Sequence, residues 1–206
     1  MINPFTTGIQ MSGKIILTDC DGVLLDWQFA FHDWMKERGY VIQDNANEFY
    51  LVHEMYKNVA EDEAKRLIRT FNESAAIGFI PALRDSIYYV RKMYEKHGYR
   101  FRVITSLSKD KHAHKLREMN LRNLFADAIE DCIFLDTGDD KDVALEPYKG
   151  SLLYWIEDKP ENAMVGFKLG LRPILMEHKH NQHARWDPYP CVSNWKDIYQ
   201  TIQRDQ

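Results

Sequence analysis

Short apolar runs alternate with amphipathic stretches along most of the chain. The runs cover residues 15–18, 101–104, 132–135, 152–156 and 173–176. Apolar runs of this length are typical of buried strands. Between them, patterns with helical spacing cover about 26–39, 81–98, 108–119, 160–169 and 194–204, and a short helix is expected before residue 152. Strands that alternate with helices predict an α/β fold with a Rossmann-like parallel sheet covered on both faces.

The stretch that follows the first apolar run departs from this alternation. Trp27, Phe31 and Trp34 fall at i, i+4 and i+7, which predicts one face of a helix. Asp26 is a suitable N-cap for this helix, and Gly39 a suitable stop. Further helices are expected at about 44–58 and 61–76, with no strand before residue 81.

A helical stretch of about 50 residues is longer than a crossover between parallel strands needs. We therefore expect residues 26–78 to form a small helical cap domain, inserted directly after the first strand. The α/β core domain would consist of residues 14–25 and 79–206. Residues 1–13 are mixed and polar, and are expected to form a loose N-terminal leader.

Composition narrows the classes of function. The chain has 206 residues, of which 45% are hydrophobic and 28% charged, as in ordinary globular proteins. Its net charge of −4 disfavours general binding to nucleic-acid polymers or anionic membranes, and no apolar run approaches the roughly 20 residues of a membrane span. Three widely spaced cysteines and the lack of a signal-peptide pattern favour a reducing, cytoplasmic location.

Two carboxylates stand immediately after the first predicted strand. Asp19 and Asp21 are one residue apart and are followed by Gly22, which allows the chain to turn sharply. Like charges this close are stable together when a cation lies between them. A divalent cation and a phosphate would explain the pair, with one carboxylate attacking phosphorus and the other moving a proton. For an isolated motif, a simple Asp-Gly turn explains the pattern equally well.

Polar residues also follow three other predicted strands. Thr105 and Ser106 end the second run, Lys141 comes after the loop that follows the third, and Glu157 and Asp158 end the fourth. Ligands of parallel sheets bind beyond the carboxyl ends of the strands. These residues are therefore expected to meet Asp19 and Asp21 at one edge of the sheet. Four polar clusters at one edge favour a catalytic site over a turn.

The four clusters, in this order, resemble the motifs of the haloacid dehalogenase-like phosphohydrolase superfamily. The matching stretches are Asp19-Cys20-Asp21-Gly22-Val23, Val103-Ile104-Thr105-Ser106, a lysine, and Trp155-Ile156-Glu157-Asp158, and the likeness extends over about residues 14–176. It implies a phosphatase that acts through an aspartyl-phosphate intermediate, with a small cap of the C1 type at 26–78. Asp19 would be the nucleophile and Asp21 the acid/base.

The resemblance also implies a Mg²⁺ ion and a set of phosphate ligands. Thr105, supported by Ser106, and Lys141 would bind the substrate phosphate. Asp19, Asp21 through its backbone carbonyl, and Asp158 would hold the metal, and Glu157 is a further candidate ligand. Thr105 and Ser106 compete for one role because they are adjacent. Lys149 competes with Lys141, and Asn162 is a candidate for orienting a metal-bound water.

The short, aromatic-rich cap and the Thr-Ser pair are loosely similar to the 5′(3′)-deoxyribonucleotidases of this superfamily. This likeness implies a small phosphorylated substrate, and a nucleoside monophosphate first of all. Glu157-Asp158 departs from that subgroup, which has paired aspartates. A phosphosugar phosphatase or mutase is the alternative, and a non-catalytic phosphate- or metal-binding module and a 3′-phosphatase of nucleic-acid ends are more distant ones. The sequence leaves open whether the chain forms an oligomer.

Three other groups of residues allow a functional interpretation, but a structural one is favoured for each. The aromatic residues of the predicted cap suit a helical core better than a base-stacking platform. A polar loop with three histidines has the composition of a zinc site but no regular spacing. A basic helix at 108–119 is expected to have a solvated face. The residues are, in turn, Trp27, Phe31, Trp34, Phe49, Tyr50 and Tyr56; His178, His180 and His183; and Lys109, Lys111, His112, His114, Lys115 and Arg117.

Overall fold

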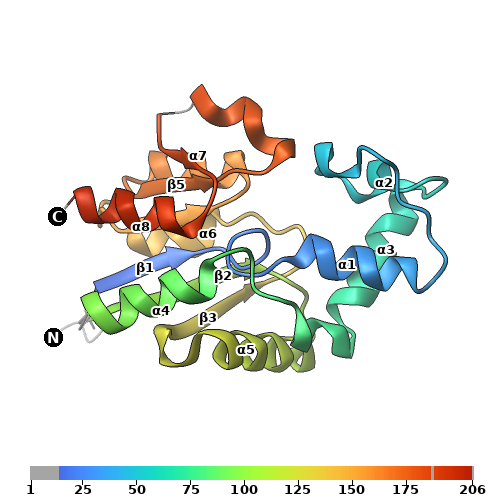
Figure 1. Cartoon of the computed structure of the whole chain (residues 1–206), viewed down its shortest axis with the longest axis horizontal. Helices are drawn as coiled ribbons and strands as arrows, with labels where there is room; N and C mark the ends of the chain where they lie inside the picture. Colours follow the sequence, from blue (N-terminus) through green and yellow to red (C-terminus); the bar gives the residue numbers. More distant parts are fainter. Residues whose placement is uncertain (1–13, 187, 206) are drawn as a thin grey trace, which may run out of the picture.

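The computed structural model describes residues 14–186 and 188–205 and contains a six-stranded sheet (Figure 1). All neighbouring strands are parallel, in the order β3-β2-β1-β4-β5-β6. The strands are β1 (Lys14–Thr18), β2 (Tyr99–Ser106), β3 (Ile129–Leu135), β4 (Tyr154–Glu157), β5 (Arg172–Met176) and β6 (Cys191–Val192). The predicted α/β class with a Rossmann-like parallel sheet is confirmed.

Strand β1 lies in the middle of the sheet, between β2 and β4. Thr18 at its end pairs with Val103 on one side and with Ile156 on the other. Strands β2 and β3 follow β1 in sequence and lie on one side of it, whereas β4, β5 and β6 lie on its other side. Such a reversal of direction opens a crevice at the carboxyl ends of the central strands. The residues that follow β1, β2 and β4 therefore meet in this crevice.

The two faces of the sheet are covered by different helices. Ile16 of β1 packs into a large core with α4, α5 and α8, whereas Ile15 and Leu17 face a second core that includes Leu145 of α6. This alternation explains why β1 is a continuous apolar run, because both faces of the strand are buried. The flanking helices are α4 (Ser86–His97), α5 (Lys111–Phe125), α6 (Asp142–Leu145), α7 (Pro160–Lys168) and α8 (Trp195–Arg204).

The segment between β1 and α4 carries the remaining helices, α1 (Trp27–Lys36), α2 (Val52–Met55) and α3 (Glu61–Asn72). They lie beyond the carboxyl ends of the strands, apart from the helices that cover the sheet (Figure 1). Asp26 caps α1 by accepting a hydrogen bond from the Phe29 amide, as its sequence position suggested. The division into a cap at 26–78 and a core stays a prediction. The predicted leader, residues 1–13, lies outside the described residues.

Aromatic rings hold this segment together. Phe31 stacks between Trp27 and Trp34, with ring centroids 4.6 and 6.0 Å away, and Phe71 of α3 meets all three rings edge-on. Tyr56 meets Phe31 from a third side. Phe31, Phe71 and Tyr56 are buried. These residues form a helical core, as the sequence favoured, and together they fix α1 against α3; Tyr50, which was expected in the same core, is exposed instead.

Three predicted helices differ from the structure, and one of them, expected at 108–119, runs over Lys111–Phe125 instead. The expected helix at 44–58 is wrong: the chain forms a 3₁₀ turn at Ala46–Glu48 and then the single-turn helix α2. Ile42 and Tyr56 pair in an antiparallel bridge, which draws the two ends of this stretch together and excludes a continuous helix. The helix expected from Pro81 begins only at Ser86, because Ala82 pairs with Leu25 in another bridge. Gly98 ends it in a left-handed conformation, as expected.

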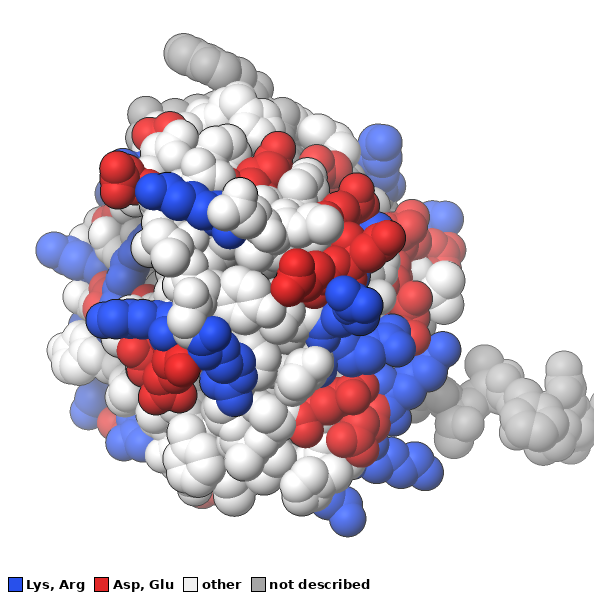
Figure 2. Space-filling model, turned by 90° about the vertical axis from the view of Figure 1, so that its right-hand side faces the viewer, with Lys and Arg blue, Asp and Glu red and all other residues white. Residues whose placement is uncertain are grey.

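Charges on the face that carries α1, α2 and α3 are mixed. Figure 2 shows acidic and basic side chains next to one another over this face, without a continuous basic surface. In the described part of the chain, no helix is both long and apolar enough to span a lipid bilayer.

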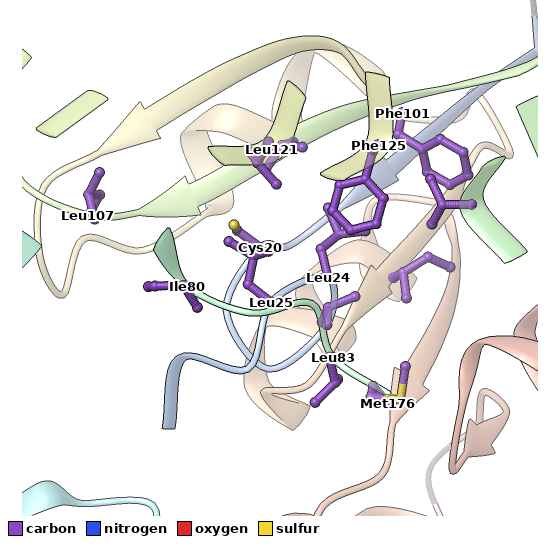
Figure 3. Packing of buried hydrophobic residues seen from close by; sticks show 14 of the residues in the cluster. Cys20, Leu24, Leu25, Ile80, Leu83, Phe101, Leu107, Leu121, Phe125 and Met176 are labelled. Carbon is purple, nitrogen blue, oxygen red and sulfur yellow. The ribbon is translucent and has the colours of Figure 1, made fainter. Parts of the chain in front are cut away.

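The loop after β1 is anchored from below by apolar side chains. Cys20, Leu24 and Leu25 are completely buried and pack among residues of β2, α5 and the segment around Leu83 (Figure 3). The Cys20 carbonyl accepts hydrogen bonds from the amides of Leu24 and Leu25, at 2.8 and 2.9 Å. The loop is therefore a rigid turn with an apolar underside, and Asp19, Asp21 and Gly22 face the crevice.

Helix α7 packs against β4 at a glycine, and this contact is a test of the fold. A Cβ atom at Gly166 would lie 2.6 Å from Cδ1 of the buried Trp155. We predict that Gly166→Ala lowers the free energy of unfolding by about 1–3 kcal/mol, because the helix must move off the sheet. Urea denaturation measures this, and Lys168→Ala, at an exposed position of the same helix, should change stability by less than about 0.5 kcal/mol. Equal stability of the two variants would contradict the described packing.

Candidate functional site

The loop that begins at Asp19 forms the floor of the candidate site. The Asp19 amide donates to the Ile156 carbonyl at 2.8 Å, which fixes the start of the loop to β4. Gly22 has φ +76°, and a Cβ atom there would lie only 2.2 Å from Oδ2 of Asp158. Glycine is therefore required at this position for two reasons: the backbone is left-handed, and the Asp158 carboxylate approaches closely.

A buried lysine joins two strand ends at this floor. The Lys141 ammonium lies 2.8 Å from Oδ1 of Asp19 and 2.8 Å from Oε2 of Glu157. Its side chain is 3% exposed, whereas that of Lys149 is 64% exposed and pairs with Glu146 on the surface. Of the two lysines that the sequence left open, the structure thus places Lys141 in the site and Lys149 outside it.

Glu157 holds its neighbours in place with both carboxylate oxygens. Oε2 accepts from Lys141, and Oε1 accepts from the backbone amides of Asp158 and Lys159, both at 3.0 Å. Glu157 is completely buried, so these bonds replace the water it loses. Its role in the geometry is to position Lys141 and the turn that carries Asp158.

Asp19, Glu157 and Asp158 offer oxygen atoms that all lie within 4.8 Å of one another. Burial, followed by the nearby charge of Glu157, raises the pKa of Asp19 to about 7. Burial, followed by the charge of Asp19, raises the pKa of Asp158 to about 7 as well. Lys141 opposes both shifts but does not cancel them. The cluster therefore carries more negative charge than its one ammonium group neutralises.

These residues fit a divalent cation with a preference for oxygen ligands. Both Glu157 oxygens are engaged with protein donors, so Asp19 and Asp158 are the carboxylates best placed to bind an ion. Mg²⁺ usually takes only one or two carboxylates from a protein and completes its shell with water and phosphate oxygens. The donor set thus suits Mg²⁺ better than zinc, which favours histidine and cysteine.

Asp21 is bound by an arginine from α5. The Arg117 guanidinium donates to both carboxylate oxygens, with Nη2 3.2 Å from Oδ2, and Nη1 also lies 3.3 Å from Sγ of Cys20. Burial raises the pKa of Asp21, and the charge of Arg117 opposes this shift. The Arg117 side chain is completely buried, so its assignment to a solvated basic face was wrong.

The sequence did contain a sign of this. The buried positions of α5 follow helical spacing, and Arg117 stands in the middle of them. They are Ala113, Arg117, Asn120, Leu121 and Phe125. An arginine on the inward stripe of an amphipathic helix indicates a buried partner, because an unpaired guanidinium would be costly there.

Thr105 and Ser106 both line the cavity above the floor. Thr105 is almost completely buried, next to the end of β1. The Ser106 hydroxyl donates to the Asp139 carbonyl at 3.2 Å and so braces the loop that leads to Lys141. This contact favours Thr105 as the hydroxyl that would bind a ligand, with Ser106 in a supporting position.

The cavity above the carboxylates has a volume of about 540 Å³. Its polar floor consists of the strand-end residues and Asn162, and its roof comes from the segment between β1 and α4. Roof residues with aromatic or aliphatic side chains are Trp27, Phe49, Tyr50, Leu51, Val52, Met55 and Ile68. Such a cavity suits a ligand with one strongly anionic end and one less polar end.

Two of the three histidines singled out in the sequence also line this cavity. Nε2 of His178 is 2.7 Å from the Gly22 carbonyl, and its ring stacks on that of His180. His183 is exposed and does not line the cavity. Among the described residues, the one three-ligand group suited to a metal ion is the carboxylate cluster around Asp19, so the histidines do not form such a group.

Comparisons with known proteins were made for the sequence and for the fold. No family model matches the sequence. An uncharacterised 32.4 kDa protein encoded in the Gp30–rIII intergenic region of Enterobacteria phage T4 is 24% identical over 149 residues, which cover 69% of this chain and 53% of the phage protein. The chain thus spans about half the length of this curated relative.

Solved structures resemble the chain over nearly its whole length. A D,D-heptose 1,7-bisphosphate phosphatase from B. bronchiseptica, complexed with magnesium and phosphate, has a TM-score of 0.56 at 13% identity, covering 94% of this chain and 99% of that one. CbbY from Rhodobacter sphaeroides, with phosphate, gives 0.57 at 16% identity and coverages of 90% and 96%. A HAD family hydrolase from Deinococcus radiodurans, with phosphate and sodium, gives 0.57 at 17% and coverages of 93% and 96%.

The chain has the haloacid dehalogenase-like fold. This confirms the fold that the sequence resemblance implied; at these identities the structural likeness supports the fold alone. The C1 type of the cap and the roles of individual residues stay predictions.

The carboxylate cluster gives a test based on pH. The pKa of Asp19 and Asp158 is about 7 in the folded chain against 3.8 ordinarily, so their contribution to stability is present below about pH 4 and lost as the pH rises to 7. A bound cation favours the ionised carboxylates and should restore that loss. We predict that Mg²⁺ at about 10 mM raises Tm more at about pH 8 than at about pH 5.5, as measured by differential scanning calorimetry. Asp158→Asn should abolish most of this pH-dependent increase. An equal Tm increase at both pH values would contradict a metal site at these carboxylates.

Proposed function

We propose that the chain is a Mg²⁺-dependent phosphomonoester hydrolase that acts through an aspartyl-phosphate intermediate. The observation that carries this proposal is the Asp19 carboxylate, held by the buried Lys141 beside Asp158 on the floor of a roofed cavity. A carboxylate between a buried ammonium group and a carboxylate that can hold a metal ion is suited to attack a phosphate, because the ammonium group and the metal ion would together offset the negative charges of both reactants.

Each of the chain's own residues has a task in this reaction. One Asp19 oxygen attacks phosphorus, while Lys141 and Thr105 bind phosphoryl oxygens. Asp21 gives its proton to the oxygen of the departing alcohol as the phosphorus–oxygen bond breaks. Asp21 then takes a proton from water, and the resulting hydroxide displaces phosphate from Asp19. Mg²⁺, held by Asp19, Asp158 and the Asp21 carbonyl, would supply further positive charge to the phosphoryl oxygens.

Two non-hydrolytic or polymer-directed functions receive less support. A binding module for metal and phosphate has no need of Asp21, a second carboxylate held at the site by a buried arginine. A 3′-phosphatase of nucleic-acid ends would need a basic channel for the polymer. The mixed charge around the roof does not provide one on the face shown in Figure 2.

For the substrate we propose a small phosphomonoester, and a nucleoside monophosphate first. The roof supports a planar, weakly polar group, because Phe49 and Tyr50 line it together with Met55. A phosphosugar phosphatase or mutase is the alternative, and a heptose bisphosphate phosphatase is among the proteins that share this fold. A cytoplasmic location is part of the proposal and follows from the cysteine pattern of the sequence.

A panel of phosphomonoesters tests this function. Purified protein with Mg²⁺ is assayed for phosphate release from deoxynucleoside monophosphates, sugar phosphates and 3′-phosphorylated oligonucleotides. We predict turnover of at least one small substrate, and a loss of at least about 10³-fold in kcat for Asp19→Asn. Folded wild type that hydrolyses no member of the panel would refute the proposed enzymatic activity. Turnover that survives in Asp19→Asn would refute the assignment of Asp19 as the nucleophile.

The two lysines provide a matched pair of variants. We predict that Lys141→Met lowers kcat/KM by about 10²–10³-fold, because a cation facing the phosphoryl group is removed. Lys149→Met should leave kcat/KM within about twofold, because this side chain lies on the surface. Lys141→Met also leaves Asp19 and Glu157 without their shared cation, so its unfolding must be checked by circular dichroism. Should it not fold, Lys141→Arg keeps the charge with a changed geometry, and its kcat/KM should still fall below that of Lys149→Met.

A further inference from the structure

Among the described residues, two cationic side chains are buried, and each is paired with one carboxylate of the same loop. Lys141 binds Asp19, and Arg117 binds Asp21. The proposed reaction gives Lys141 a task at the phosphate, but it leaves Arg117 without one. A completely buried guanidinium is costly, so its position calls for an explanation.

Arg117 and the cavity lie on different sides of the Asp21 side chain. Arg117 approaches it from inside the protein and is 0% exposed, whereas the Asp21 side chain is 24% exposed and lines the cavity. The guanidinium therefore lies behind the carboxylate, and the substrate would lie in front of it. Two parallel hydrogen bonds from a planar fork fix both the position and the plane of a carboxylate, which a single contact cannot do.

We propose that Arg117 is a positioning residue, which holds the Asp21 carboxyl group in the orientation needed for proton transfer to the leaving group. This inference rests on the proposed hydrolase function and adds a residue to it. Asp21 transfers its proton to the bridging oxygen of the substrate as the bond from that oxygen to phosphorus breaks. The transfer needs a short, aligned contact, so free rotation of the carboxyl group would slow it.

The helix that carries Arg117 is itself fixed. Its Asn120 donates to the Ile80 carbonyl at 2.9 Å, and Gly78 lies against Leu116 and Met119 so closely that a Cβ atom would come within 3.2 Å of the Met119 methyl group. Arg117 also donates to Sγ of Cys20, in the loop after β1. These contacts fix the position of the Arg117 guanidinium, and its hydrogen bonds in turn fix the Asp21 carboxylate.

Substrates that differ in leaving group separate this role from a purely structural one. An alcohol leaving group depends on the proton of Asp21, whereas 2,4-dinitrophenolate leaves without it. The measured quantity is kcat/KM, which covers the steps up to departure of the leaving group. The substrates are 2,4-dinitrophenyl phosphate and an alkyl phosphate from the panel that the wild type hydrolyses.

We predict that Arg117→Met lowers kcat/KM for the alkyl phosphate by about 10–100-fold, and for the dinitrophenyl ester by less than about threefold. Arg117→Lys should restore part of the alkyl activity, because it keeps the charge but not the fork. In an Asp21→Asn background, Arg117→Met should cause no further loss. Arg122→Met, which removes an exposed arginine paired with Glu118 on the same helix, should leave both substrates unaffected.

Equal losses on both substrates, or losses of Arg117→Met and Asp21→Asn that multiply, would overturn the inference. If Arg117→Met does not fold, Arg117→Lys and the double variant carry the test, because neither leaves Asp21 as an unpaired buried charge. A wild type that is inactive on every substrate would overturn the proposed function and this inference with it. An active wild type with unselective Arg117 variants would overturn this inference alone.

Discussion

The structure of the site depends on one ammonium group between two buried carboxylates. Lys141 lies 2.8 Å from both Asp19 and Glu157, and so joins the end of β1, the end of β4 and the loop before α6. Each of the three charges would be costly to bury alone, and together they are still short of positive charge. The remaining imbalance makes the floor of the cavity suited to a divalent cation.

The sequence predicts the parts of the site that follow from periodicity and strand ends. Asp19, Thr105 and Asp158 each follow an apolar run, and the parallel sheet brings such positions together by its geometry. Arg117 was missed because arginine in a basic helix is usually solvated, and only its place on the inward stripe of α5 shows otherwise. Glu157 was expected as a possible metal ligand; it belongs to the carboxylate cluster, and the hydrogen bonds that engage both of its oxygens are specified by no sequence pattern.

Pairing between residues distant in sequence explains two of the errors in secondary structure. The stretch 44–58 contains good helix formers, but the bridge between Ile42 and Tyr56 prevents a continuous helix. The two-residue strand β6 is too short to form a recognisable pattern, and it is held in place by its pairing with β5. Contacts between residues distant in sequence decided both cases. Helix α1, by contrast, has its own cap and its own aromatic face, and its start was predicted to within a residue, although it ends at Lys36, before the expected stop at Gly39.

The roof of the cavity enters and leaves the fold at one place. The Asp26 amide donates to the Pro81 carbonyl at 2.8 Å, and Leu25 pairs with Ala82, so the two connections run side by side. The intervening residues therefore join the sheet through one short stem, and they also contact the core where Gly78 lies against α5 and where Asn72 donates to the Leu107 carbonyl. None of them pairs with a strand of the sheet, so the strand register that brings Asp19, Thr105 and Asp158 together does not depend on their length. The shape of the roof and the geometry of the floor are thus set by two separate parts of the sequence.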